Sequence, residues 1–240
     1  MKILLVADIH ANWPALQAIN ETFDACLVLG DIVDYGTDPG PCVDWVRRHA
    51  TFAIRGNHDH AVVQSVEARG GSGLKGLAAV TRPLQRQLLD KSQLKYLSRL
   101  PVTQSFCLDN LNFLLVHATP RDPLDEYLPN EVGAWREVLH SVDADIVCVG
   151  HTHIPFELNV DGIRVINPGS VGQPRDGDAR CAYAVIENRQ VHFRRVEYDI
   201  DLTVAQMRET GMEPWVVNLA ESMLRTGGKP TVGSQYPASK

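Results

Sequence analysis

The stretch Lys2–His10, KILLVADIH, joins a run of apolar residues to a polar end that carries an aspartate and a histidine. Four later stretches repeat this pattern: ACLVLGDIVD (25–34), TFAIRGNHDH (51–60), LNFLLVHATP (111–120) and ADIVCVGHTH (144–153). Continuous apolar runs rich in Val, Ile and Leu are typical of strands that are covered on both faces. The sequence therefore predicts buried strands that each end in polar side chains.

Helical segments separate these runs. Residues 12–23 begin with Asn12 as a cap and a proline two residues later, both of which are helix start signals. Residues 40–50 also begin near a proline and end in basic residues, and residues 130–142 have Asn130 as a possible cap. Strands that alternate with helices indicate the α/β class.

Three β-rich segments follow the last of these runs. They are IRVINPGSVG (163–172), CAYAVIEN (181–188) and VHFRRVEYD (191–199), with Glu187-Asn188 as the expected hairpin tip. Turn residues separate them, as between successive strands. They predict a second sheet that packs on the first.

Residues 65–100 read as a helical insertion after the third apolar run. The insertion opens with the flexible RGGSG (69–73) and continues as a helical stretch over 84–100. Because it directly follows a polar strand end, it can form a lid over a site or a peripheral scaffold, and the sequence does not choose between them.

We expect a single domain over residues 1–200 and a helical extension over 201–225. Residues 226–240 have the Gly, Pro and Ser content of a flexible tail.

The composition excludes several classes of protein. The chain has 240 residues, 44% of them hydrophobic and 22% charged, which is ordinary for a globular protein. A net charge of −6 argues against bulk nucleic-acid binding. The apolar runs are too short for a signal-peptide core or a membrane span. Five scattered cysteines without a C-x-x-C motif indicate free thiols, and we expect a cytoplasmic protein without disulfides.

Potential ligands gather at the ends of the five apolar runs. In α/β sheets, binding groups collect where strands end, at the carboxyl edge. The candidates in chain order are Asp8, His10, Asp31, Asp34, Asn57, His58, Asp59, His117, His151 and His153. Each could begin a turn or cap a helix by itself, but five coincident strand ends favour one shared site.

The chemistry of this set indicates metal binding. It contains oxygen and imidazole donors without a thiolate, which suits Mn, Fe, Zn, Co or Ni. The donors are too many for one ion and about enough for two, which two-metal sites hold roughly 3.5–4 Å apart. Asp31 is the natural bridging candidate, because a carboxylate has two oxygens. Two dications would make the pocket net positive, so we expect an anionic substrate.

The ordered motifs DIH, GDIVD, GNHD, a lone VH and GHTH resemble those of the calcineurin-like metallophosphoesterase superfamily. They span Asp8 to His153 in the family's order. The longer phrases LLVADIHANWPALQA, GDIVDYGTDP, VHATPRDP and NPGSVGQPRDGD resemble the YfcE-like phosphoesterase branch and extend the match to about Val196. The resemblance implies a four-layer αββα sandwich, in which helices flank two packed β-sheets.

The resemblance also implies roles for individual residues. One metal would be held by Asp8, His10, Asp31 and His153, and the other by Asp31, Asn57, His117 and His151. A hydroxide that bridges the metals would attack phosphorus in line, with manganese as the favoured metal and Fe, Zn, Ni or Co as alternatives. His58 would protonate the leaving oxygen, and Asp34 would orient it.

Two departures narrow the substrate. Tyr35 stands where serine/threonine protein phosphatases and symmetrical diadenosine tetraphosphate hydrolases carry an arginine, and Asp59 replaces a glutamate of the protein phosphatases. We therefore expect hydrolysis of small phosphodiesters, with nucleotide-derived diesters among the candidates. Phosphomonoesters or dinucleoside polyphosphates are the alternatives, and a metal-binding interaction scaffold is a third hypothesis. Asn12 and Arg175 are candidate substrate contacts, although a cap role suffices for Asn12. The sequence leaves the oligomeric state open.

Overall fold

The computed structural model describes residues 1–68 and 73–229. Its strands are β1 (Lys2–Val6), β2 (Ala25–Val28), β3 (Phe52–Ala53), β4 (Thr103–Leu108), β5 (Leu111–Val116), β6 (Ile146–Cys148), β7 (Phe156–Val160), β8 (Ile163–Asn167), β9 (Cys181–Glu187) and β10 (Gln190–Val196). The helices are α1 (Trp13–Gln17), α2 (Pro39–His49), α3 (Asn57–Gln64), α4 (Leu74–Leu88), α5 (Lys91–Arg99), α6 (Val132–Leu139), α7 (Ile200–Glu209) and α8 (Pro214–Thr226). Each of the five apolar runs contains a strand, as predicted.

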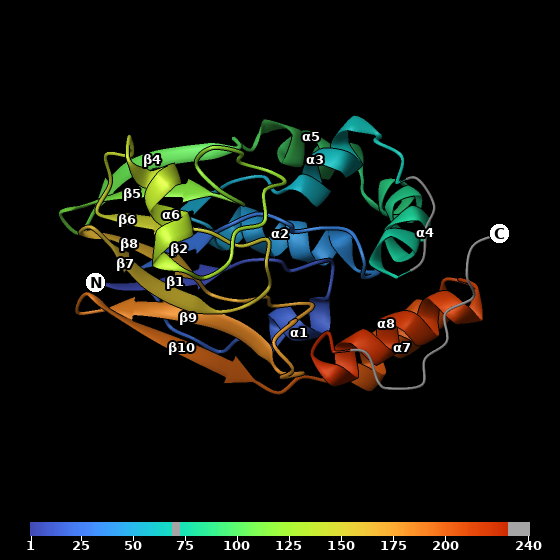
Figure 1. Cartoon of the computed structure of the whole chain (residues 1–240). Coiled ribbons are helices and arrows are strands. Elements are labelled where there is room, and N and C mark those ends of the chain that lie inside the picture. The colour runs from blue at the N-terminus through green and yellow to red at the C-terminus, as the bar shows by residue number, and fades with distance from the viewer. Residues whose placement is uncertain (69–72, 230–240) are drawn as a thin grey trace.

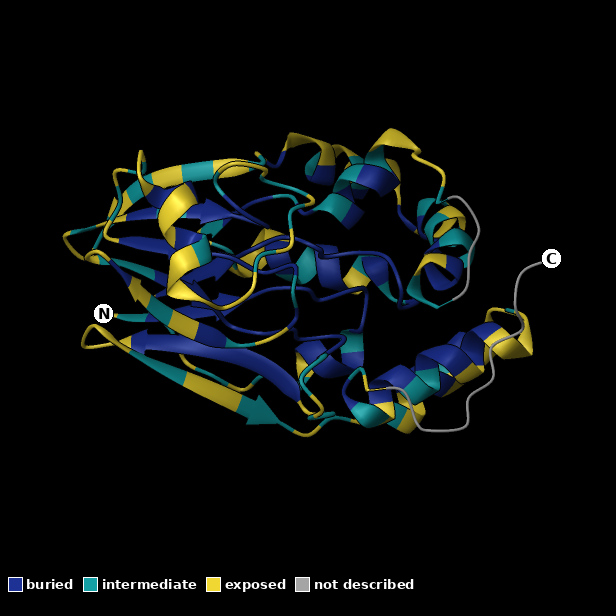
Figure 2. Ribbon diagram, in the orientation of Figure 1, coloured by how far each residue is buried: buried dark blue, intermediate teal, exposed yellow. Residues whose placement is uncertain are grey.

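The strands form two five-stranded mixed sheets, in the orders β10-β9-β1-β2-β3 and β4-β5-β6-β8-β7 (Figure 1). Along β1, Ile3 and Leu5 pack between the two sheets in one cluster with Phe113 of β5. Leu4 and Val6 belong to a second cluster on the opposite face, under the helices. Both faces of β1 are therefore covered, which explains why its run is apolar throughout. Figure 2 shows the same burial along the central strands.

Helices cover the outer face of each sheet. Leu16 of α1 and Val43 of α2 pack on the first sheet, in one cluster with Val28 of β2. Trp135 of α6 packs on the second sheet with Val147 of β6. The result is the four-layer αββα sandwich that the resemblance implied.

The composition of the two sheets differs from the prediction. The segments after His153 do not form the second sheet together. β9 and β10 pair antiparallel with each other, and β9 pairs with β1, so they extend the first sheet. β8 joins the second sheet through parallel pairing with β6, which itself pairs with β5. An apolar pattern indicates a strand, but it does not specify which other strand will be its hydrogen-bonded neighbour in a sheet.

Three helix boundaries also differ. The helix expected over 12–23 ends at Gln17, and the chain then returns to the sheet, where the N–H of Asp24 donates to the carbonyl of Lys2 at 2.8 Å. Asn130 is not a cap, because α6 begins after Glu131.

The helical stretch over 84–100 is divided at Asp90, which starts α5 as its cap. Its carboxylate accepts from the N–H groups of Ser92 and Gln93 at 2.7 and 2.8 Å, and this pairing favours a new helix start over continuation.

The insertion and the C-terminal segment pack against each other. Leu77 of α4 lies in one apolar cluster with Met207 of α7 and Val216 of α8. The RGGSG segment (69–73) and the expected tail (226–240) lie largely outside the described residues. The five cysteines are free thiols, as expected. None of the helices within residues 1–68 and 73–229 is long and apolar enough to cross a membrane.

Candidate metal centre and active site

The carboxyl ends of five strands bring the candidate ligands together. β1, β2 and β3 run parallel in the first sheet, and β5 and β6 run parallel in the second. The segments after these strands carry Asp8 and His10, Asp31, Asn57 (the first residue of α3), His117, and His151 and His153, in that order. The first sheet supplies the carboxylates, the amide and His10, and the second sheet supplies imidazoles alone.

Two groups of donors share Asp31. Ligand atoms of Asp8, His10, Asp31 and His153 all lie within 4.8 Å of one another, and those of Asp31, His117 and His151 form a second such group. All of these side chains are buried. For the carboxylates and imidazoles, the grouping follows the division between two metals that the resemblance implied. Asn57 lies beside the shared carboxylate, because the N–H of the next residue, His58, donates to Asp31 Oδ1 at 2.9 Å.

Backbone carbonyls orient the histidine rings. Three of them donate Nδ1–H to a carbonyl: His10 to Val33 (3.2 Å), His117 to Leu29 (2.7 Å) and His153 to Gln173 (2.5 Å). A ring nitrogen that faces a carbonyl carries the proton, so Nε2 of each ring is a lone-pair donor. His151 is reversed, since its Nε2 faces the carbonyl of Asp125 at 3.2 Å and leaves Nδ1 as the donor. In its neutral form, each ring therefore offers one unprotonated nitrogen to the cluster.

The unsatisfied donors test whether metal ions fit this cluster. Nε2 of His10 and Nε2 of His153 lie 3.2 Å apart, so two lone pairs face each other. Asn57 Oδ1 is buried without a hydrogen-bond partner among the described residues. His117 Nε2 is also buried, and the Asp31 carboxylate lies 3.3 Å from it. A buried polar atom left without a partner costs about 1–3 kcal/mol. Cations between these atoms would satisfy all of them, and nitrogen and oxygen donors suit divalent transition metals. The residues therefore fit the metal ions that the donor set predicts.

The charges at the cluster also favour cations. Burial raises the pKa of Asp8 to about 7. Burial opposes ionisation of Asp31 as well, but His117 and His58 hold the pKa of its carboxyl well below the usual range. Burial disfavours the protonated ring of His117, yet the Asp31 carboxylate raises its pKa to about 10. The two carboxylates thus draw positive charge into the cluster, and a metal ion would meet the same demand.

The loops that carry the ligands have a strained backbone. Asp8, His10, Asp31, His151 and His153 all have positive φ, between 51° and 66°. For residues other than glycine this conformation costs roughly 1–2 kcal/mol each, and such strain concentrates at functional sites. The strained conformation turns each loop sharply after its strand, so that residues two positions apart, such as Asp8 and His10, both reach the cluster.

Buried polar side chains keep these loops in place. The Asp59 carboxylate accepts from the N–H groups of Ile32, Val33 and Gly56 at 2.8, 3.1 and 3.0 Å. Its position in the sequence made Asp59 a possible ligand, but it lies in neither donor group. Gly56 is required for the close approach, because a Cβ there would overlap the Asp31 carboxylate.

The loop after β8 provides further support that the sequence reasoning missed. Ser170 Oγ donates to the carbonyl of Asp8 at 2.8 Å, and Asn167 Nδ2 donates to the carbonyl of Gly150 at 2.6 Å. Both residues stand in the phrase NPGSVGQPRDGD that supported the resemblance, which was the available signal.

His58 and Asp34 form a pair beside the metal cluster. His58 Nδ1 lies 2.8 Å from Asp34 Oδ2, and Asp34 is fully buried. Burial disfavours the protonated ring, but the Asp31 and Asp34 carboxylates raise the pKa of His58 above its ordinary value. The Tyr35 ring packs against His58 with 4.5 Å between centroids. This arrangement matches the orienting role that the resemblance implied for Asp34.

A cleft of about 460 Å³ opens next to this pair. Asn57 and His58 line it together with three cationic side chains: Lys75 and Arg82 from α4, and Arg175 from the loop after β8. Arg175 donates from Nη2 to Gln173 Oε1 at 3.1 Å, while its buried Nε has no partner among the described residues. Arg175 thus lines the same cleft as His58.

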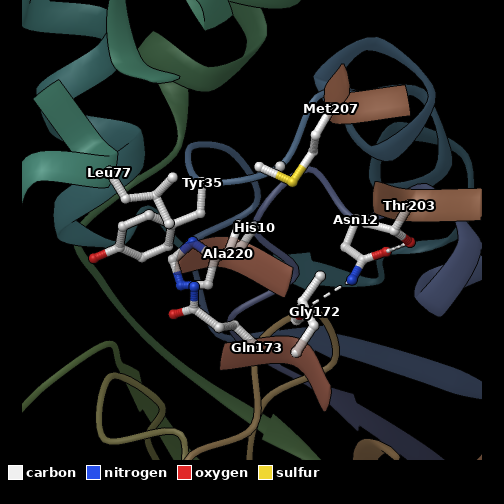
Figure 3. Close-up of a pocket in the computed structure, with 11 residues that line it drawn as sticks. His10, Asn12, Tyr35, Leu77, Gly172, Gln173, Thr203, Met207 and Ala220 are labelled. Carbon is white, nitrogen blue, oxygen red and sulfur yellow. Dashed lines mark hydrogen bonds between the residues drawn. The ribbon is translucent and has the colours of Figure 1, made fainter. Parts of the chain in front are cut away.

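Asn12 lies elsewhere, behind His10 in a narrow space of about 20 Å³ (Figure 3). Its Nδ2 donates to the carbonyl of Gly172 at 2.9 Å, and its Oδ1 accepts from Thr203 Oγ1 at 3.1 Å and from the N–H of Ala15 at 3.3 Å. These bonds cap α1 and tie it to α7. Both polar atoms of the Asn12 amide group therefore have hydrogen-bond partners within the protein.

Comparison with known proteins adds independent information. Residues 1–190 match the model of the calcineurin-like phosphoesterase superfamily domain. An uncharacterized protein of Methanocaldococcus jannaschii is 30% identical over 240 aligned positions, which cover 89% of this chain and 95% of that protein. Phosphodiesterase YfcE of Escherichia coli K12 is 26% identical over 78% of this chain and 88% of its own length. The crystal structure of a metallophosphoesterase from Sphaerobacter thermophilus, 34% identical, superposes with a TM-score of 0.81 over 95% of this chain and 99% of that one.

Proposed function

Because the chain belongs to the calcineurin-like phosphoesterase superfamily, in its YfcE-like branch, we propose that it hydrolyses small phosphodiesters with two divalent metal ions. Membership makes it a hydrolase of phosphoester bonds, and the metal number and the diester preference are the proposal. The observation that carries it is the pair of donor groups that share Asp31 next to His58.

We assign the ligands as the two donor groups suggest. Asp8, His10, Asp31 and His153 would bind one ion, and Asp31, Asn57, His117 and His151 the other. When bound, the two ions would lower the pKa of a water nucleophile and offset charge on the phosphate oxygens. Mn²⁺ is our first choice, with Fe, Zn, Ni or Co as alternatives that the same donors accept.

His58 would transfer a proton to the leaving oxygen. Its Nδ1–H donates to Asp34 at 2.8 Å, so Nε2 is the nitrogen available for the transferred proton. Asp34 keeps the ring in this tautomer and orientation, as the orienting carboxylate does in other acid–base sites. Arg175 would bind a phosphate oxygen through its unpartnered Nε.

The shape of the cleft supports a diester over a monoester. Beyond Tyr127 and Arg175 the cleft adjoins a second hollow of about 380 Å³, which these two residues also line. Its wall includes the apolar side chains of Ile154 and Phe156. A second esterified group of the substrate would find room and apolar contacts there, whereas a monoester would leave the hollow unused.

The test is nitrophenolate release by metal-stripped protein with and without Mn²⁺. We expect metal-dependent turnover of bis-p-nitrophenyl phosphate that exceeds turnover of p-nitrophenyl phosphate. A preference for the monoester would contradict the diester assignment. Diadenosine tetraphosphate in the same assay addresses the polyphosphate alternative, which the absence of an arginine at Tyr35 disfavours. A folded protein that binds two ions but turns over none of the three would favour the scaffold hypothesis.

A further inference from the structure

We infer that helix α4 of the insertion supplies two positioning residues, Thr81 and Arg82, which orient His58 through Asp34. The inference rests on the proposed function, because it concerns the proton donor of that reaction. Thr81 and Arg82 lie 47 and 48 residues after Asp34 in the sequence.

The contacts of Asp34 carry the inference. Oδ2 accepts from His58 Nδ1 at 2.8 Å and from Arg82 Nε at 3.1 Å. Oδ1 accepts from Thr81 Oγ1 at 2.6 Å and from the N–H of Tyr35 at 2.9 Å. A carboxylate has about four lone-pair sites, so each is used and two of the four partners come from α4. Without α4 the carboxylate would keep the histidine but lose the contacts that fix its own position.

The surroundings make these contacts strong. The side chains of Asp34 and Arg82 are 0% and 12% exposed, and Thr81 is fully buried. An ion pair that is shielded from water is screened far less than one on the surface. Arg82 also donates from Nη1 to the carbonyl of Val66 at 3.1 Å, which anchors its own side chain to the segment after α3. The guanidinium is thus held at both ends.

A third residue of α4 ties the same loop. Gln85 Nε2 donates to the carbonyl of Gly36 at 2.6 Å, and Gln85 lies four residues after Thr81, on the same face of the helix. One face of α4 therefore contacts the loop from Asp34 to Gly36 at both of its ends. The insertion is therefore part of the active site. This role differs from both alternatives that the sequence offered, a lid and a peripheral scaffold.

A proton donor held in one orientation matters most when the leaving oxygen is strongly basic. Diphenyl phosphate releases phenolate, which needs a proton in the transition state. Bis-p-nitrophenyl phosphate releases the weakly basic p-nitrophenolate, which needs it much less. A loss of orientation at His58 should therefore slow the first substrate selectively, whereas a general disturbance of the site should slow both alike.

The experiment compares kcat for these two diesters in wild-type protein and in the Arg82→Ala and Thr81→Val variants, all loaded with Mn²⁺. We expect about a tenfold loss with diphenyl phosphate and less than about a threefold loss with bis-p-nitrophenyl phosphate, a fraction of the whole contribution of a general acid. KM of Thr81→Val and the number of bound ions in both variants should not change. Arg82→Lys and Thr81→Ser, which keep a donor at each position, should recover part of the lost rate.

Arg86→Ala is the matched control. Arg86 lies one turn further along α4 and donates to the carbonyls of Val62 and Val63 in α3, so its loss removes a helix–helix contact without touching Asp34. Its two rates should stay at the wild-type level. Equal losses on both substrates in Arg82→Ala and Thr81→Val, or wild-type rates in both, would overturn the inference while leaving the proposed function intact. A wild-type protein that hydrolyses neither diester would overturn both together.

Discussion

The metal cluster and the Asp34 network lie side by side, with His58 between them, yet they differ in how their buried polar atoms are satisfied. In the cluster, Nε2 atoms of His10 and His153 face each other, and Asn57 Oδ1 has no partner within the described chain. In the network, both oxygens of Asp34 accept two hydrogen bonds each. The Asp34 carboxylate has all its hydrogen-bond partners within the protein, whereas the metal cluster has donor atoms that need cations as partners.

This difference indicates which part of the site depends on bound metal ions. A buried polar group must find a partner somewhere. In the proposed function the cluster finds its partners in metal ions, so its geometry and stability should respond to metal. The Asp34 network finds them in α3 and α4, so it should keep its geometry with or without metal. The predictions that follow test this division.

Asp31→Asn should have the largest effect, because Asp31 belongs to both donor groups. Several kcal/mol of transition-state stabilisation depend on bound metal, so we expect turnover to fall on the order of 10³-fold or more. Metal analysis should find fewer than two ions per chain. Two retained ions would contradict the sharing of Asp31 by the two donor groups. They would also contradict the dependence of ion binding in the metal cluster on this carboxylate.

His58→Ala should lower kcat by roughly 10²-fold or more, the usual contribution of a general acid. His58 lies in neither donor group, so metal content should stay at the wild-type value. The pair of measurements separates the two regions, since Asp31→Asn alters both and His58→Ala alters turnover alone. Wild-type turnover in His58→Ala would remove the catalytic role from this histidine.

Metal removal should destabilise the cluster without a change in sequence. At a metal concentration 100 times the dissociation constant, binding stabilises a protein by about 2.7 kcal/mol. For a chain of this size that corresponds to a rise in Tm of roughly 5–10 °C. Scanning calorimetry with Mn²⁺ and with a chelator measures the shift, and Asp31→Asn serves as the control with a reduced shift. An equal shift in wild type and variant would place the stabilising ions elsewhere.

Asp34→Asn should have the smallest effect on turnover, about a tenfold loss. The amide oxygen can still accept from His58 Nδ1–H, but the negative charge that attracts the ring and Arg82 is gone. Two ions per chain should remain bound, because the substitution leaves both donor groups intact. A loss of metal in this variant would show that the network and the cluster are not separable.

The candidate ligands were predictable from the sequence because each donor follows closely after an apolar run. A strand has a direction, so the polar residues after it must lie at its carboxyl edge, and five such strands in one architecture bring Asp8, Asp31 and His151 to a common edge. The resemblance to known motifs assigned each donor to one metal or the other, and the observed groups of carboxylates and imidazoles divide in the same way, with Asn57 in neither group. The family and the layered architecture followed from the same motifs.

Other features were out of reach because they depend on contacts between distant segments. The pairing of β9 with β1 joins residues more than 170 positions apart, and no local pattern distinguishes it from pairing with β8.

The roles of Thr81 and Arg82 have the same cause. On a helix, polar residues at such positions are typical of a solvated surface, and their contact with Asp34 exists only once α4 has packed against the loop after β2. The early end of α1 at Gln17 likewise follows from the return of the chain to β1 at Asp24.

The residues that could bind metal were therefore predictable from the sequence. An apolar run and the polar residues that follow it are neighbours in the chain, so a short stretch of sequence contains the whole signal. The tertiary structure alone decided which nitrogen of each histidine faces the cluster, which strands share a sheet, and which residues of the insertion support Asp34. Those outcomes are set by hydrogen bonds that must be satisfied between segments far apart in the chain once water is excluded.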